Sequence, residues 1–162
     1  MWLLLGTGGR GKAFKDLAYG DYGKYLVKDH ISAAKYLQGL TYVDADNIGI
    51  WGWSGGGYLT NMCMTLASDY YKAGISIAPN VEPLLYDTIW TERYMGLIED
   101  NPEGYKNASV LTHVDKAKGH LLQIHGNADD NVHHQHSLKL AKAYAEHGKE
   151  MEMFIYPNAN HG

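Results

Sequence analysis

Residues 48–56 read Ile-Gly-Ile-Trp-Gly-Trp-Ser-Gly-Gly, an apolar run that leads into a G-x-S-x-G pentapeptide at 52–56. A strand, a sharp turn and a helix in this order hold a serine in a strained elbow with its hydroxyl exposed. We expect a Cβ at Gly52 or Gly56 to collide where the strand and the helix converge. Ser54 is therefore the candidate nucleophile, and a glycine-rich turn with an ordinary serine is the alternative interpretation.

Strands and helices alternate on both sides of this elbow. Helices are expected at residues 24–38, 58–67 and 134–147. Short apolar runs predict strands at residues 2–5, 48–51, 73–78, 121–125 and 153–156. The aromatic-rich stretch between the third and fourth of these strands is irregular, with room for one or two short helices. The alternation predicts an α/β fold in a single domain over residues 1–162, with a mainly parallel sheet of about five strands flanked by helices.

Composition limits the class of protein. The net charge is −4 and there is no long basic run, which argues against nucleic acid or an anionic membrane as a partner. No segment approaches the ~20 apolar residues of a membrane span, and the first residues do not form a signal-peptide core. As written, the chain stays where it is made, and its compartment is left open. The single cysteine, Cys63, excludes an internal disulfide and is expected to be a small buried hydrophobe.

A glycine-rich segment near the start raises the question of a cofactor. Residues 6–11 read G-T-G-G-R-G and satisfy the G-x-G-x-x-G spacing of dinucleotide-binding loops. That motif requires a helix that starts inside it, and Gly20 and Gly23 break the stretch that follows. We interpret the segment as an arginine-bearing loop and expect no cofactor.

Three kinds of polar group stand just past the carboxyl ends of three expected strands. They are Ser54, the pair Asp129 and Asp130, and His161. Parallel α/β sheets collect functional groups at this end, and the order Ser…Asp…His is that of the α/β-hydrolases. A serine hydroxyl is a weak nucleophile until a neighbouring base takes its proton. An imidazole can take that proton, and a carboxylate on the far ring nitrogen orients it.

In this interpretation His161 is the base and an aspartate orients it. The backbone N–H of Gly55, directly after the nucleophile, would face the developing oxyanion.

Three stretches together resemble the catalytic domain of the prolyl oligopeptidase family, nearest to the dipeptidyl peptidase IV group of serine peptidases. They are residues 52–58 (GWSGGGY), 91–96 (TERYMG) and 125–132 (HGNADDNV). The similarity runs from about Gly6 to the end of the chain. It implies that Asp129, and not Asp130, is the acid of the triad.

The resemblance also implies a pocket for the substrate residue before the scissile bond. Its lining would be Tyr86, Trp90, Asn131 and Val132. The sequence departs from the family at several places that shape this region: Gly55 replaces an aromatic residue, Asn80 and Pro83 replace bulkier or more apolar ones, and Leu3–Leu5 replace an Asp-Gly-Arg-like stretch. We therefore expect a wider and less proline-selective pocket.

Family members carry an N-terminal β-propeller and further strands that this sequence does not contain. One missing loop supplies the second oxyanion donor, whose loss typically costs about 10²–10³ in turnover. The family's helix after the histidine is also missing, so Pro157 and local packing must hold His161 or its loop will fray. A missing strand would leave a sheet edge open, and open edges pair with other chains. We therefore expect a homo-oligomer whose interface covers that gap.

The histidines near residue 134 offer a competing interpretation. His133, His134 and His136 are spaced so that a helical turn could bring two of them to a metal ion. We favour a solvated start of a helix and expect no metal.

These observations predict a serine hydrolase in which Ser54, His161 and Asp129 cleave small esters through an acyl-enzyme, with peptides or amides as further candidate substrates. The alternatives are an inactive fragment of a dipeptidyl peptidase-like enzyme and a metal-dependent hydrolase that uses the histidine cluster.

Overall fold

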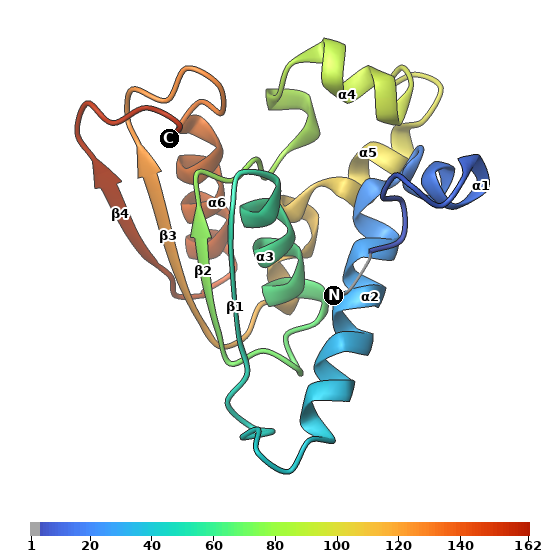
Figure 1. The fold of residues 1–162 in the computed structure, drawn as a ribbon. Coiled ribbons are helices and arrows are strands. Elements are labelled where there is room, and N and C mark those ends of the chain that lie inside the picture. Colours follow the sequence, from blue (N-terminus) through green and yellow to red (C-terminus); the bar gives the residue numbers. More distant parts are fainter. Residues whose placement is uncertain (1–3) are drawn as a thin grey trace.

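The computed structural model describes residues 4–162 and has helices packed beside a parallel sheet (Figure 1). In chain order the elements are α1 (Lys12–Lys15), the 3-10 helix η1 (Asp16–Ala18), α2 (Tyr22–Gln38), β1 (Gly49–Trp53), α3 (Gly55–Leu66), β2 (Ala73–Ile77), η2 (Pro83–Leu85), α4 (Thr88–Met95), α5 (Pro102–Ala108), η3 (Val110–Lys116), β3 (His120–Gly126), α6 (Gln135–Glu146) and β4 (Glu152–Tyr156). Each expected helix and four of the five expected strands are present.

The sheet of the described residues has four parallel strands in the order β1-β2-β3-β4. The α/β architecture is therefore confirmed, with four strands where about five were expected. The expected strand at residues 2–5 is the difference. Its first two residues lie outside the described part of the chain, and Leu4 and Leu5 are not in a strand. Leu5 instead donates its backbone N–H to Asp29 of α2, which ties this segment to a helix and not to the sheet.

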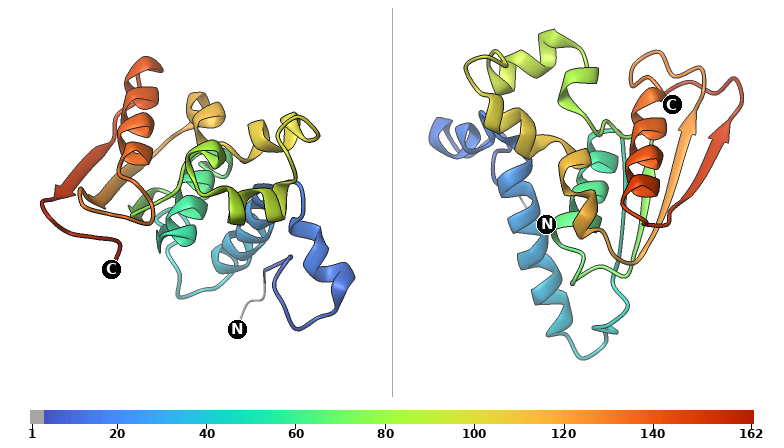
Figure 2. Two further views of the ribbon diagram at one scale, coloured as in Figure 1. Left: turned by 90° about the horizontal axis from the view of Figure 1, so that it is seen from above. Right: turned by 180° about the vertical axis from the view of Figure 1, so that it is seen from behind.

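The helices lie on one side of the sheet (Figure 2, left). Helix α3 packs on β1 and β2, and α2 packs on α3. Strand residues alternate accordingly: Gly52, Gly74 and Ser76 point to the helices and are buried. Their neighbours point to the other face, where Trp51 is 73% exposed and Ile75 is 42% exposed. Parallel sheets normally have both faces covered, so this face stands out as bare within residues 4–162.

The core lies between the helices and the sheet. Helix α3 contributes most to it, because its residues from Gly57 to Thr65 are all buried. Cys63 is fully buried there, as expected, and burial raises the pKa of its thiol to about 12. The thiol is therefore protonated at neutral pH and acts as a packing residue.

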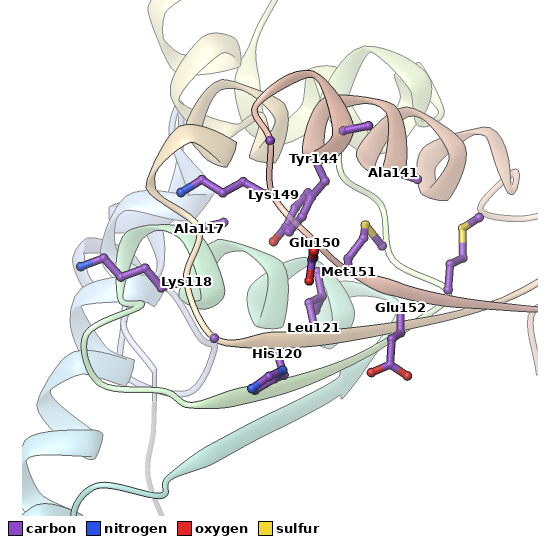
Figure 3. A pocket seen from close by; sticks show the side chains of 14 residues that line it. Ala117, Lys118, His120, Leu121, Ala141, Tyr144, Lys149, Glu150, Met151 and Glu152 are labelled. Carbon is purple, nitrogen blue, oxygen red and sulfur yellow. The ribbon is translucent and has the colours of Figure 1, made fainter.

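The two ends of the sheet differ in shape. The strands point upward in Figure 1, and the loops after β1, β3 and β4 meet at the top, near the C-terminus. At the other end, an open hollow of about 720 Å³ lies between β3, β4 and the last turn of α6 (Figure 3). None of the helices in residues 4–162 has the length and the apolar composition of a membrane-spanning segment.

Candidate functional site

Ser54 stands at the sharp turn between β1 and α3. Its backbone lies at φ 57° and ψ −118°, outside the favourable regions for a residue with a side chain. Two hydrogen bonds hold this conformation: Ser54 N–H donates to Ile77 O at 2.8 Å, and Tyr58 N–H donates to Ser54 O at 2.9 Å. Strain of this kind persists only where the surroundings over-determine it, and it is common at functional sites.

The glycines around Ser54 are not equivalent. A Cβ on Gly52 would lie 2.2 Å from Gly56 O, so a side chain there is excluded, as expected. The expectation for Gly56 was wrong, because a Cβ at that position would meet nothing within 4 Å. The tight position is Gly57, whose Cβ would lie 2.8 Å from Ile77 O. The reason is geometric: residue 57 is the one that faces β2, whereas residue 56 faces solvent.

Asp129 follows β3 and is 3% exposed. Its Oδ1 accepts the backbone N–H groups of Asn131 at 3.0 Å and Val132 at 2.8 Å. Burial raises the pKa of the Asp129 carboxyl, but the hydrogen bonds from His161, Val132 and Asn131 outweigh it and the net pKa is lowered. The carboxyl group is therefore ionised at neutral pH. The neighbouring Asp130 is exposed.

His161 joins the other two side chains. Its Nδ1 lies 2.7 Å from Asp129 Oδ2, and its Nε2 lies 2.9 Å from Ser54 Oγ. An ionised carboxylate can only accept, so Nδ1 carries the proton and Nε2 accepts the serine hydroxyl. We call this chain of hydrogen bonds the Ser54–His161–Asp129 relay.

The loop that carries His161 is fixed by contacts that the sequence did not reveal. Pro157 was expected to hold it, but Pro157 is exposed. The loop is tied instead to the turn after β3: Ala128 N–H donates to Ala159 O at 3.0 Å, and a Cβ on Gly126 would lie 2.3 Å from Ala159 O. This close approach requires glycine at position 126.

Trp53 also holds His161 in place. Its indole N–H donates to the carbonyl of His161 at 2.9 Å, and the two rings lie 5.0 Å apart between centroids. The expected strand ended at Trp51, so Trp53 had no assigned role. Its position beside the nucleophile, on the bare face of the sheet, is the signal that could have identified it.

The residues expected to line the pocket come together only in part. Tyr86 O–H donates to Asn131 Oδ1 at 3.1 Å, and its ring meets that of Trp90 at 5.7 Å between centroids. Trp90 also packs against Tyr94. Val132, in contrast, is 1% exposed, and its backbone serves the Asp129 network. Aromatic side chains from α4 therefore stand beside the loop that carries Asp129.

The three clustered histidines have different surroundings. His133 and His134 lie ring against ring at 4.6 Å, and His133 is exposed. His136 is buried in α6, where its Nδ1 accepts the backbone N–H of Val81 at 3.0 Å. Within residues 4–162, no three side chains of the ligating kinds are grouped to hold a metal ion.

Comparisons with known proteins agree with this architecture. The family model described as "Prolyl oligopeptidase family" matches residues 4–162. The chain is 39% identical to dipeptidyl peptidase 4 of Felis catus over 160 residues, and 38% identical to prolyl endopeptidase FAP of Homo sapiens over 162 residues. These alignments cover 97% and 95% of the chain.

A solved structure shows the same fold. The crystal structure of Porphyromonas gingivalis dipeptidyl peptidase 4 matches with a TM-score of 0.94 and 40% identity, over 98% of this chain. The chain spans only about a fifth of these relatives: 21% of each of the two peptidases and 22% of the crystallised protein. With a family model matched over nearly its whole length, the chain belongs to the prolyl oligopeptidase family.

Proposed function

We propose that this chain carries the nucleophile, base and acid of a serine hydrolase that cleaves small esters and, more slowly, peptides. The observation that supports the proposal best is the unbroken relay from Ser54 Oγ through the imidazole of His161 to Asp129. The strained backbone at Ser54 and the peptidase names of the relatives support it independently.

The proposed reaction has two halves. Ser54 Oγ attacks the carbonyl carbon while His161 Nε2 takes the hydroxyl proton, and His161 then gives that proton to the leaving group. Asp129 stabilises the imidazolium that forms between these events. Water then hydrolyses the Ser54 ester by the same proton transfers in reverse.

Gly55 is the proposed donor to the oxyanion. It is the first residue of α3, where the backbone N–H has no partner inside the helix, and it is exposed beside Ser54. The N-terminus of a helix also favours negative charge. Activated esters are proposed to react faster than amides, because their leaving groups need little protonation by His161.

The proposed substrate site uses Tyr86, Trp90 and Asn131. The edge-to-face pair of aromatic rings offers an apolar wall, and the Tyr86–Asn131 hydrogen bond fixes that wall beside the loop of Asp129. Val132 is proposed to contribute by packing from behind. A small apolar side chain next to the cleaved carbonyl is the substrate group that such a wall accommodates.

Hydrolysis of p-nitrophenyl acetate by the Ser54→Ala variant tests the proposal. Free imidazoles also cleave this ester, so the result depends on the difference between variants. We expect Ser54→Ala to abolish the protein-specific rate, a loss of up to about 10⁶-fold where a full triad operates. The matched control is Ser32→Ala, which removes an exposed serine on α2.

Three outcomes separate the proposal from its rivals. A rate that falls in Ser54→Ala but not in Ser32→Ala or with EDTA supports it. An unchanged rate in Ser54→Ala that EDTA removes favours metal-dependent hydrolysis. Equal rates in all variants, no higher than free imidazole, indicate an inactive fragment.

We further propose that the chain self-associates through β1. This strand forms an edge of the sheet in the described residues, and its residue Trp51 is largely exposed. An unpaired edge of this kind is a template for another strand. Light scattering at micromolar concentration is expected to give at least twice the mass of the chain, and a strictly monomeric species would refute it.

A further inference from the structure

A second histidine lies behind the relay. His125 is the penultimate residue of β3 and is 1% exposed. Its Nε2 lies 2.7 Å from the carbonyl oxygen of Val132 and 3.2 Å from Asp129 Oδ2. Its Nδ1 lies 2.5 Å from Ser137 Oγ on α6. The ring therefore bridges the end of the sheet, the Asp129 loop and the helix packed behind them.

These partners determine where the protons lie. A carbonyl oxygen can only accept a hydrogen bond, so the proton of His125 is on Nε2. The Nδ1 lone pair then accepts the hydroxyl proton of Ser137. Burial lowers the pKa of His125 in spite of the nearby Asp129, which keeps the ring neutral. The Nε2–H group faces both Val132 O and Asp129 Oδ2.

The same carboxylate oxygen serves both histidines. Asp129 Oδ2 accepts from His161 Nδ1 on one side and faces His125 Nε2 on the other. Oδ1 is held by two backbone N–H groups. The backbone donors fix one oxygen, and His125 limits rotation of the other, so that a lone pair of Oδ2 stays aimed at His161. A neutral ring is needed here, because a cation would compete with imidazolium for Asp129.

We propose that His125 is a positioning residue, which, as a neutral Nε2–H imidazole anchored by Ser137, orients the carboxylate of Asp129 and through it the ring of His161. The proposal rests on the proposed hydrolase function for its effect on turnover, and on geometry alone for its effect on His161. An apolar side chain of the same size could fill the space of His125, but it has no N–H group to donate to Asp129 and Val132.

Two substitutions separate the donor from the rest of the ring. The amide nitrogen of His125→Gln reaches the place of Nε2 and can donate to Val132 and Asp129. In His125→Asn the side chain ends near the place of Nδ1, so it can accept from Ser137 but cannot reach Asp129. The matched control is His120→Asn, the same change on the same strand at an exposed position.

Steady-state kinetics on p-nitrophenyl acetate give the first readout. We expect His125→Asn to lower kcat by about 10²-fold with little change in KM, because misplacement of a catalytic group by about 1 Å costs that much. His125→Gln is expected to stay within about tenfold of the unaltered chain, and His120→Asn to be unchanged. Equal losses in the Asn and Gln variants at equal melting temperature would overturn the proposal.

The second readout does not depend on turnover. In a ¹H–¹⁵N NMR spectrum of the full chain, the proton on His161 Nδ1 should give a low-field signal assigned by its loss in His161→Gln. The signal is expected to persist in His125→Gln and to broaden or shift in His125→Asn. A signal unaffected by His125→Asn would overturn the positioning role. If the signal responds as expected while Ser54→Ala shows no loss of rate, the hydrolase proposal fails and the positioning role stands.

Discussion

The two ends of the parallel sheet hold different kinds of surface. At the carboxyl end, Ser54, His161 and Asp129 come from loops after three strands and meet within hydrogen-bonding distance. At the amino end lies an open hollow of about 720 Å³, bounded by side chains such as Lys118 and Glu150 (Figure 3).

The difference follows from how the polar groups are held. Asp129 is buried, and its two oxygens are contacted by two backbone N–H groups and by the ring N–H groups of His161 and His125, so its position and charge are fixed. At the amino end, His120 and Glu152 are exposed and water can solvate them. A buried charge held in place by hydrogen bonds, as Asp129 is, can stabilise a charge that develops during a reaction without having to reorient. Substitutions at the carboxyl end of the sheet are therefore expected to change hydrolysis or stability, and substitutions at the amino end serve as controls.

Among substitutions that keep the Ser54 hydroxyl, the largest effect is expected from Asp129→Asn. An amide keeps the shape of the carboxylate but can present an N–H group to His161, which favours the wrong tautomer of the imidazole. A loss of about 10⁴-fold in kcat is the scale known for this change in a serine protease triad. Ester hydrolysis with circular dichroism as a check on folding measures it, and a loss below tenfold would mean that Asp129 does not orient His161.

A large effect on stability is expected from acid, because the carboxyl end contains buried histidines. Burial is the main cause that lowers the pKa of His136 to about 4, whereas an unfolded histidine titrates near 6.5. Between these values the unfolded chain binds the proton and the folded chain does not. Stability therefore falls as the pH falls from about 6.5 to about 4, by about 3 kcal/mol from this residue.

Urea unfolding at pH 7 and pH 4.5 measures this acid effect. His136→Asn keeps an acceptor for the Val81 N–H and removes the titrating group. We expect this variant to lose part of the pH dependence, although its stability at pH 7 is lower. His120→Asn at the amino end is expected to keep the full dependence, and the opposite pattern would contradict the assignment.

A smaller effect is expected from Trp53→Phe. This change removes the indole N–H that donates to His161 O but leaves an aromatic ring beside the imidazole. A neutral hydrogen bond contributes about 1 kcal/mol, which corresponds to about fivefold in the population of the aligned His161 loop. The rate of ester hydrolysis should fall by about that factor. A loss as large as that of Asp129→Asn would show that Trp53 does more than hold the loop.

The smallest effect is expected at the amino end. Glu150→Gln changes a charge in the hollow of Figure 3 and touches none of the relay. Exposed substitutions of this kind usually stay within about 0.5 kcal/mol in stability. Hydrolysis and the urea midpoint should both match those of the unaltered chain, and a clear fall in hydrolysis would mean that the two ends of the sheet are coupled.

Local patterns in the sequence predicted the strands and the elbow, because each follows from nearby residues. The sequence of residues 48–56 predicted β1, the turn at Ser54 and the start of α3. In the described part of the segment at residues 2–5, Leu4 and Leu5 do not form the expected strand. An apolar run alone does not show which strand it would pair with. The steric requirement for glycine was expected at Gly56 but lies at Gly57. It arises from the close approach of β2 to α3, a tertiary contact that the local sequence does not show.

The supporting side chains of the site were harder to predict for the same reason. Trp53 contacts His161, which is 108 residues away in the chain, and His125 contacts Ser137 only because α6 packs behind the end of β3. Nothing in their local spacing distinguishes them from core or surface residues. The three proposed reacting residues were easier to find, since each directly follows a strand in a sheet whose carboxyl end collects such groups.

Reaction with a fluorophosphonate tests most directly whether His161 activates Ser54, because this reagent modifies an activated serine. Peptide mass mapping should locate a single adduct on Ser54 in the unaltered chain and in His120→Asn, and no adduct at the same exposure in His161→Gln. An unmodified Ser54 in the unaltered chain, or equal modification in His161→Gln, would contradict the account.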